Sequence, residues 1–263
     1  MNKILSVTDL TSYMYCPVKY YLQKVVGIRK PPTKVMIEGK IRHEVMEIFS
    51  KNEPALVQEF TKPLPSKEIT LSYLSLLSEV IKQTFSYEYD QMRKFMVSPN
   101  SLRENIIVGL NQEIILRAKA VEHTMSLGFL GKELWQNLEP KYYSEFFIES
   151  PSMELKGKID RVMLSKNSIV PFELKTRPVD KIYDTDEIQL TAYAMLLEEY
   201  FKQPIPTGII ESGNIRHTPD IKEEKKQKVL SLIKEIHDLE KPVFPKSFAK
   251  CQNCDFKEEC DNL

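Results

Sequence analysis

Two strand-like segments joined by a short polar turn form the part of this sequence that most limits its fold. Residues 156–176 read KGKIDRVMLSKNSIVPFELKT. Apolar and polar residues alternate in KIDRVML, SIVPFEL is rich in β-branched and apolar residues, and the intervening SKNS consists of turn-forming residues. We therefore expect a β-hairpin with strands at about 153–164 and 168–175.

Charged residues of this hairpin are expected to converge. With the turn centred in SKNS, antiparallel pairing sets Asp160 opposite Glu173, and their Cβ atoms would lie roughly 4.5–5.5 Å apart. Lys175 shares the face of Glu173, whereas Leu174 points to the opposite, apolar side. Two such carboxylates repel each other unless positive charge lies between them. A divalent cation is the first hypothesis, and the alternative is an exposed hairpin in which one lysine neutralises two acids.

The four cysteines have the spacing of a metal centre. Cys251 and Cys254 are separated by two residues, Cys260 follows closely, and Cys16 lies near the other end of the chain. Zinc and a 4Fe-4S cluster both accept four thiolates. An isolated cysteine combined with one remote CxxC favours iron–sulfur, because zinc sites more often use two CxxC pairs, and zinc stays the alternative. Either centre would join the two chain ends.

Composition sets only broad limits on function. The 263 residues are 42% hydrophobic, which is enough for a buried core. The 37 basic and 37 acidic side chains cancel, so net charge neither supports nor excludes nucleic acid, although GIRKPPTK is a local basic patch. The N-terminus lacks the apolar core of a signal peptide, and no apolar run approaches the roughly 18 residues of a membrane span. We expect a folded cytoplasmic protein without a membrane association.

Helical periodicity dominates the first half of the chain. A first helix is expected to begin with Ser6 or Thr8 as its N-cap and to break or bend near Pro17. A second carries His43 and repeats apolar residues at helical spacing from Ile37 onward.

Two long amphipathic helices without a chemical motif are predicted at 66–97 and 101–127, with their charges on solvated faces.

The second half combines strands and helices. After a strand at 141–149 and the hairpin, the pattern predicts a helix at 184–202, a strand at 205–211 and a helix at 221–239. On the first of these helices, Gln189 and Tyr193 are four residues apart and so share one face. They could point toward the acidic hairpin, and the alternative is a helix end with a buried tyrosine.

Together these motifs resemble the RecB-like branch of the PD-(D/E)xK nucleases. The residues that carry the resemblance are, in order, His43 in EGKIRHEVME, Asp160 in GKID, Glu173 and Lys175 in FELKT, and Gln189 with Tyr193 in QLTAY. The CPVKYYL context of the first cysteine and the three terminal cysteines are similar to the iron–sulfur members of that branch. The closest of these is the family of the fourth core CRISPR-associated (Cas) protein, and AddB-type helicase–nucleases are more distant.

The resemblance implies an α/β fold with a restriction-endonuclease-like core, in which helices flank a mixed β-sheet. We expect residues 1–263 to form a single nuclease domain, with a helical insertion or lobe at 50–135. Residues 1–24 and 245–263 are expected to form the cluster-binding part, in which the four cysteines hold a 4Fe-4S cluster.

The resemblance also implies a catalytic metal site. Mg²⁺ or Mn²⁺ would be held by Asp160, Glu173, the Leu174 carbonyl and His43, and Lys175 would position a water and balance charge on the phosphorus.

Two further pairs of residues are expected near that site. Gln189 and Tyr193 would orient the DNA strand or the lysine. Glu145 and Glu149, on the preceding strand, are candidates for a supporting position, and a solvated strand face explains them equally well.

The function implied is a metal-dependent DNA exonuclease that can also have endonuclease activity. Its substrate would be single-stranded DNA or DNA with single-stranded ends, trimmed for CRISPR spacer acquisition beside the integrase proteins. A stand-alone repair or viral nuclease is the second possibility, and a non-catalytic, cluster-stabilised DNA-binding subunit is the third. The intact Asp and Glu-x-Lys set argues against the third, because a pure binder has no need of clustered acids beside phosphates.

Overall fold

The structure is a computed structural model that describes residues 3–175, 181–212, 215–240, 242, 244, 251–252 and 254–263. The chain forms two compact units. The terminal unit comprises Met1–Pro31, Phe146–Ile159 and Val170–Leu263, and the helical unit comprises Pro32–Glu145 and Asp160–Ile169. Within the described ranges, no helix is both long enough and apolar enough to span a membrane.

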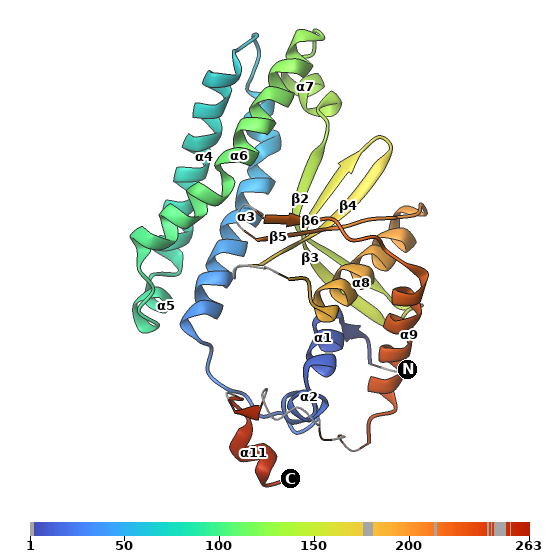
Figure 1. The fold of residues 1–263 in the computed structure, drawn as a ribbon. Helices are drawn as coiled ribbons and strands as arrows, with labels where there is room; N and C mark the ends of the chain where they lie inside the picture. The colour runs from blue at the N-terminus through green and yellow to red at the C-terminus, as the bar shows by residue number, and fades with distance from the viewer. Residues whose placement is uncertain are drawn as a thin grey trace. The chain divides into compact units, whose positions relative to one another are not determined.

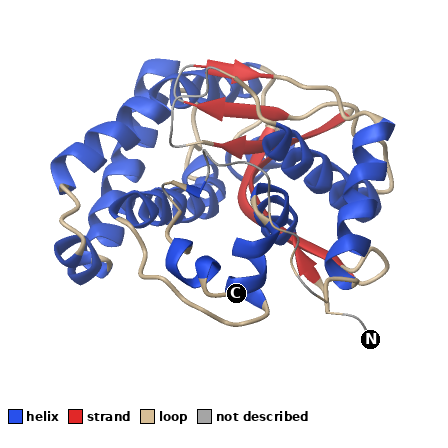
Figure 2. Cartoon of the chain, turned by 60° about the horizontal axis from the view of Figure 1, so that its bottom comes forward, coloured by secondary structure: helices blue, strands red, loops and turns tan. Residues whose placement is uncertain are grey.

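A six-stranded mixed sheet runs in the order β1-β3-β4-β5-β6, with β2 also pairing with β3. Its strands are red in Figure 2. The strands are β1 (Leu5–Ser6), β2 (Lys141–Ser150), β3 (Leu155–Ser165), β4 (Ser168–Leu174), β5 (Ile209–Ser212) and β6 (Ile215–His217). β1 is parallel to β3 and β4 is parallel to β5, whereas β5 and β6 are antiparallel. The predicted mixed sheet flanked by helices is confirmed.

The predicted hairpin is also confirmed, because β3 and β4 are separated only by the two residues Lys166 and Asn167. The hydroxyl oxygens of Ser165 and Ser168 lie 2.8 Å apart across this turn. Local turn chemistry was therefore sufficient to place it.

The strand predicted at 205–211 is too long at its start. β5 begins only at Ile209, because the preceding backbone bonds elsewhere. Gly208 N–H donates to the Pro219 carbonyl, and the Pro206 carbonyl accepts from Ile221 N–H at 2.8 Å. At Gly208 a Cβ atom would come within 2.7 Å of the Leu190 side chain, so glycine permits this close approach.

The N-terminal helices of the terminal unit follow the prediction. α1 (Val7–Tyr15) begins after the N-cap Ser6, whose hydroxyl accepts from Asp9 N–H, while the Asp9 carboxylate accepts from Ser6 N–H. The helix stops at Cys16, and α2 (Pro17–Lys24) starts at a proline, which suits the first helical position.

Three longer helices of the terminal unit pack together. α8 (Asp184–Phe201) contacts both α1 and α9 (Glu223–His237), as Figure 1 shows. The predicted helices at 184–202 and 221–239 are thus confirmed. The short α11 (Lys257–Asp261) packs against α2, which brings the two ends of the chain together.

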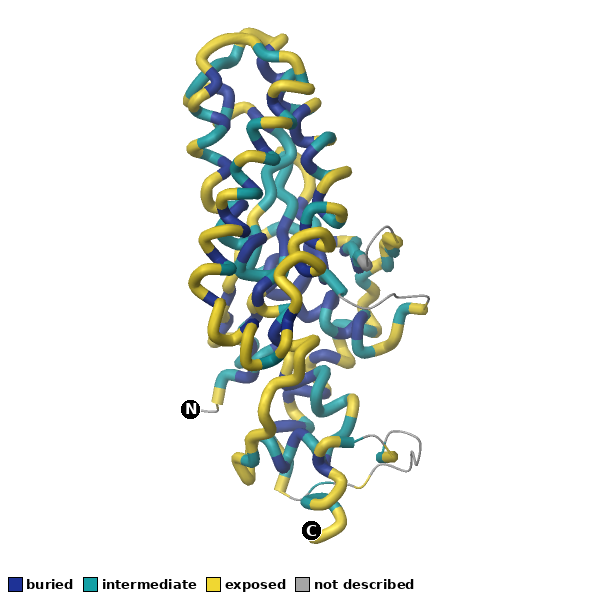
Figure 3. The backbone as a smooth tube through the Cα atoms, turned by 90° about the vertical axis from the view of Figure 1, so that its left-hand side faces the viewer, coloured by how far each residue is buried: buried dark blue, intermediate teal, exposed yellow. Residues whose placement is uncertain are grey.

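The helical unit is built on α3 (Lys34–Gln58), which packs against α4 (Ser66–Tyr87) and α7 (Gly131–Asn137). α6 (Pro99–Ser126) lies along α4, and the short α5 (Tyr89–Lys94) follows α4 after a break at Glu88 (Figure 1). One predicted helix, 66–97, is therefore two helices. In Figure 3 buried and exposed residues alternate along these helices, as the amphipathic pattern predicts.

Not all charges of these helices are solvated, and that expectation is wrong for Arg117. Its side chain is only 7% exposed, and its Nε donates to Glu53 Oε1 at 2.7 Å. The Tyr73 hydroxyl donates to the same carboxylate at 2.8 Å. Arg117 also donates to Glu113, whose second oxygen lies 2.7 Å from Arg161 Nη1. These charged side chains can be buried because each of them forms an ion pair with a side chain of opposite charge.

Candidate active site

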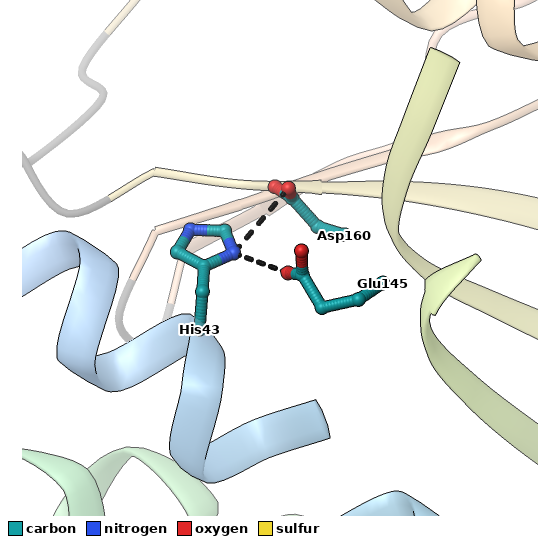
Figure 4. A group of neighbouring side chains, drawn as sticks. All are labelled: His43, Glu145 and Asp160. Atoms are coloured by element: carbon teal, nitrogen blue, oxygen red, sulfur yellow. Dashed lines mark hydrogen bonds and ion pairs between the residues drawn. The ribbon is translucent and has the colours of Figure 1, made fainter. Parts of the chain in front are cut away.

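A histidine and two carboxylates meet in the helical unit (Figure 4). Nδ1 of His43, on α3, lies 2.6 Å from Oε1 of Glu145, on β2, and 3.5 Å from Oδ1 of Asp160, on β3. One potential ligand atom from each residue lies within 4.8 Å of those of the other two. The carboxylates are mostly buried, with side-chain exposures of 8% for Glu145 and 13% for Asp160, and His43 is 30% exposed.

Local contacts explain how α3 and β2 meet at this point. Ser50 follows His43 by two helical turns, so both lie on the same face of α3. The Ser50 hydroxyl donates to the Tyr142 carbonyl at 3.0 Å and accepts from Ser144 N–H at 3.3 Å. One side chain thereby ties α3 to the backbone of β2 immediately before Glu145.

The backbone of Glu145 is itself unusual. Its φ is +55°, in the left-handed region that non-glycine residues seldom adopt. Such a conformation costs on the order of 1–3 kcal/mol and persists only where surrounding contacts enforce it. At Glu145 these contacts are of two kinds. The Ser50 hydroxyl binds the backbone of Tyr142 and Ser144, an arrangement that we call the Ser50 clamp, and the His43 ring contacts the Glu145 carboxylate. Strain of this kind is concentrated at functional sites.

The donor set fits a hard divalent cation. Carboxylate oxygens suit Mg²⁺ and Mn²⁺, and an imidazole nitrogen is accepted more readily by Mn²⁺. A carboxylate that accepts a hydrogen bond from one ring nitrogen of a histidine fixes the tautomer and leaves the other nitrogen as the ligand. Glu145 is placed to do this at Nδ1 of His43. The alternative that Glu145 lies on a solvated strand face is wrong, because its side chain is mostly buried. Glu149 is exposed, and its Oε2 lies 4.0 Å from Lys156 Nζ.

A second polar group lies in the terminal unit, where four predicted residues come together. Lys175 Nζ is 3.0 Å from Glu173 Oε1, and it donates to Gln189 Oε1 at 3.3 Å. Gln189 Nε2 donates to Glu173 Oε2 at 2.7 Å and to the Tyr193 hydroxyl at 3.1 Å. The predicted shared face of Gln189 and Tyr193 is confirmed, and it is directed at the Glu-x-Lys motif.

Packing of α8 on the sheet holds this group in place. A Cβ atom at Gly157 of β3 would lie 3.0 Å from both the Tyr193 ring and Leu196, so the missing side chain lets α8 approach. At the end of β4, Lys175 N–H donates to the Glu211 carbonyl of β5 at 2.8 Å. Leu174 is paired in register with Glu211, and a metal-binding role for its carbonyl stays a prediction.

Sequence reasoning missed Asp186 in this group. Its Oδ1 lies 2.8 Å from Lys175 Nζ, and its side chain is only 4% exposed. Burial alone would lower the pKa of the Lys175 ammonium, but the carboxylates of Glu173 and Asp186 outweigh burial and raise that pKa. The available signal was spacing, because Asp186 precedes Gln189 by three residues and so shares its helix face.

Asp160 and Glu173 belong to different units, so their predicted pairing across the hairpin stays a prediction.

The four cysteines lie where α2 meets the C-terminal segment, within the terminal unit. Phe256 is buried against Val18 and Leu22, and Cys16, Cys254 and Cys260 pack around this small core.

The thiols are also close enough to influence one another. Burial raises the pKa of the Cys260 thiol, and the neighbouring Cys16, Asp261, Cys251 and Cys254 raise it further. Four thiolates are the ligand set of zinc sites and of 4Fe-4S clusters alike. Of the predicted cluster-binding part, residues 1–2, 245–250 and 253 lie outside the described residues.

Comparison of the sequence with known proteins identifies the family of this chain. The sequence model of the PD-(D/E)XK nuclease superfamily matches residues 4–261. The CRISPR-associated exonuclease Cas4/endonuclease Cas1 fusion of Leptospira interrogans (serogroup Icterohaemorrhagiae serovar Lai, strain 56601) is 28% identical over 149 residues, which are 50% of this chain and 28% of that protein. The CRISPR-associated exonuclease Cas4 of Francisella tularensis subsp. novicida (strain U112) is 27% identical over 119 residues, 44% of this chain and 60% of that protein.

The matches therefore span less than two thirds of either relative. Among solved structures, that of SSO0001 is 15% identical, covers 98% of this chain and 85% of its own, and gives a TM-score of 0.40. That TM-score is too low to support a shared fold, so the assignment rests on the family model, which spans nearly the whole chain. The chain belongs to the PD-(D/E)XK nuclease superfamily.

Proposed function

We propose that this protein is a metal-dependent DNA exonuclease, able also to cut as an endonuclease, that hydrolyses phosphodiester bonds at DNA ends. The observation that carries the proposal is the convergence of His43, Glu145 and Asp160 within 4.8 Å of one another, in a chain matched by a nuclease family model. Clustered carboxylates repel phosphate unless a cation lies between them, so a site of this composition suits metal-assisted hydrolysis.

The residues divide into ligands and supporting groups. His43, Asp160, Glu173 and the Leu174 carbonyl would hold Mg²⁺ or Mn²⁺, and Glu145 would orient the His43 ring. The bound cation supplies polarisation of the scissile phosphate and activation of water.

Lys175 contributes a fixed positive charge. Its ammonium would position the attacking water and balance negative charge that develops on the phosphoryl oxygens. Gln189 donates to Glu173 and accepts from Lys175, so a single amide orients both groups. Tyr193 in turn accepts from Gln189 and limits the rotation of that amide.

The cysteines are proposed to hold a 4Fe-4S cluster. The isolated Cys16 and the remote CxxC favour iron–sulfur over zinc. Lys19 N–H lies 3.4 Å from the Cys16 sulfur, and this donor suits a thiolate better than a thiol. Because the ligands come from both chain ends, the cluster would stabilise the terminal unit as well as bind metal.

The proposed biological role follows from the Cas4 relatives. The Leptospira relative is named as a fusion of an exonuclease with the endonuclease Cas1. We infer that this protein trims single-stranded DNA, or DNA with single-stranded ends, in the cytoplasm for CRISPR spacer acquisition, beside integrase proteins. A stand-alone repair nuclease would have the same chemistry, and the genes adjacent to the coding sequence would separate the two roles.

The test uses anaerobically purified protein and end-labelled single- and double-stranded DNA. We expect cleavage with Mg²⁺ or Mn²⁺ and none with EDTA. Asp160→Asn and Lys175→Ala should abolish cleavage without lowering the melting temperature, while Glu149→Gln, on the exposed face of β2, should cleave like the parent protein. Undiminished cleavage by both site variants would overturn the proposal.

A further inference from the structure

We propose that Asp186 is a positioning residue that keeps the Lys175 ammonium in the active site when a metal ion occupies Glu173. The inference rests on the proposed function, because it assigns a partner to the lysine of that site. It adds a residue that neither the Glu-x-Lys motif nor the Gln189 and Tyr193 pair contains.

The geometry places Lys175 between two buried carboxylates. Its Nζ lies 3.0 Å from Glu173 Oε1 and 2.8 Å from Asp186 Oδ1. The side chains are 15%, 7% and 4% exposed for Lys175, Glu173 and Asp186. A buried charge is tolerated only when it is paired, so one ammonium here satisfies two acids.

Metal binding would change this balance. With a divalent cation bound at Glu173, the Glu173 carboxylate would no longer need Lys175 for neutralisation, and the Lys175 ammonium would be repelled at short range. The remaining contacts of Lys175 in this group are Gln189 Oε1, a neutral acceptor at 3.3 Å, and the Asp186 carboxylate. Asp186 thus supplies the charge that holds a long and flexible lysine side chain near the phosphate.

Asp186 is itself well placed for this task. It lies in the first turn of α8, where the helix dipole stabilises a negative charge. Its Oδ2 accepts from Tyr183 N–H at 3.3 Å, and its Oδ1 lies 2.8 Å from Lys175 Nζ. Asp184 occupies the same turn, but its side chain is 85% exposed and its ion pair with Lys225 is long, at 3.9 Å. Asp184 is therefore a matched control.

The experiment compares Asp186→Asn, Asp186→Glu and Asp184→Asn. Asparagine can still accept from Tyr183 N–H, so it removes the charge and keeps the helix cap. We expect Asp186→Asn to lower kcat about tenfold or more, since displaced catalytic groups have effects of this size, with little change in KM or in half-saturating Mn²⁺. Asp186→Glu should recover part of the rate, and Asp184→Asn should match the parent protein.

A second measurement separates positioning from a structural role. The side-chain ammonium signal of Lys175, identified by its absence in Lys175→Ala, should persist in ¹H–¹⁵N spectra of the parent protein with saturating Mg²⁺. It should disappear in Asp186→Asn.

The outcomes distinguish this inference from the proposed function. Full activity of Asp186→Asn, with Lys175→Ala inactive, would overturn the role of Asp186 alone. Unchanged cleavage by both Lys175→Ala and Asp160→Asn would instead overturn the proposed function. If Asp186→Asn is unstable, failure of a stable Asp186→Glu variant to retain the ammonium signal would count against the inference.

Discussion

Oε1 of Glu145 lies 2.6 Å from Nδ1 of His43, although the two residues are 102 positions apart in the sequence. The contact joins the long helix α3 to the middle of β2 and occurs at a residue, Glu145, whose φ is +55°. Glu145 thus combines a short hydrogen bond between ionisable groups with a strained backbone. Strain of this kind is typical of functional residues. The first two predictions concern this contact.

Removal of the Glu145 carboxylate should weaken metal binding. Loss of a carboxylate that orients a ligating histidine typically costs 10- to 100-fold in metal affinity, so Glu145→Ala should raise the Kd for Mn²⁺ by about that factor. Glu145→Gln retains an acceptor and should have a smaller effect. Isothermal titration with Mn²⁺ measures both, and Glu149→Ala is the control because that side chain is exposed. Parent-like affinity of Glu145→Ala would contradict the assignment.

Ser50 should support the same contact from α3. Ser50→Ala removes both the donor to Tyr142 and the acceptor of Ser144 N–H, and it should lower the free energy of unfolding by about 1–3 kcal/mol. It should also weaken Mn²⁺ binding, because Glu145 follows the released segment. Urea unfolding checks the first effect. Ser86→Ala is the control, since that hydroxyl only donates within the exposed face of α4. Equal stabilities of the two variants would rule out the clamp.

The buried charges of the helical unit should be sensitive to single substitutions. Arg117→Met leaves Glu53 buried at 1% exposure without its arginine, and breaking such a pair should cost about 3–5 kcal/mol. Lys119→Met, on the exposed side of the same helix, should change stability by less than about 0.5 kcal/mol. Chemical denaturation of both variants tests the difference. A mild effect at Arg117 would mean that water replaces the lost partner.

The terminal unit should lose stability in acid through Asp9. Burial would raise the pKa of this carboxyl, but hydrogen bonds from Ser6 and Lys24 outweigh burial and lower it. A group whose folded pKa is depressed contributes stability that is present above its unfolded pKa, near 3.8, and is lost as the pH falls through the folded pKa. The deficit of Asp9→Asn relative to the parent protein should therefore shrink below pH 4 in pH-dependent unfolding. A deficit that is constant from pH 7 to pH 2 would contradict this linkage.

The cysteines predict a coloured, iron-containing protein. Anaerobically purified protein should be brown and contain about four irons per chain, as a 4Fe-4S cluster requires. Cys251→Ser should lose iron and lower the melting temperature together, because the ligands join α2 to the C-terminal segment. Iron analysis and absorption spectra test this directly. Stoichiometric zinc without iron would decide for the other metal.

Local sequence determined most of the secondary structure. The Ser6 capping box, the proline that opens α2 and the SKNS turn each act through residues within a few positions, so periodicity and turn chemistry locate them. The shared face of Gln189 and Tyr193 follows from helical spacing alone. The predicted start of β5 was too early, because Pro206 and Gly208 form backbone hydrogen bonds with Ile221 and Pro219. The sequence before β5 gives no sign of these partners.

Tertiary structure decided which charges are paired and buried. Glu145 and Glu149 look equivalent on one strand, yet the left-handed backbone and the distant His43 give only Glu145 a partner on α3. Asp186 and Asp184 share one helical turn, and only the first reaches Lys175. Arg117 is buried because Glu53, 64 residues away, faces it. The energy of an ion pair depends on the distance between its charges in space. The sequence reveals such proximity only for residues a few positions apart on the same helix or strand.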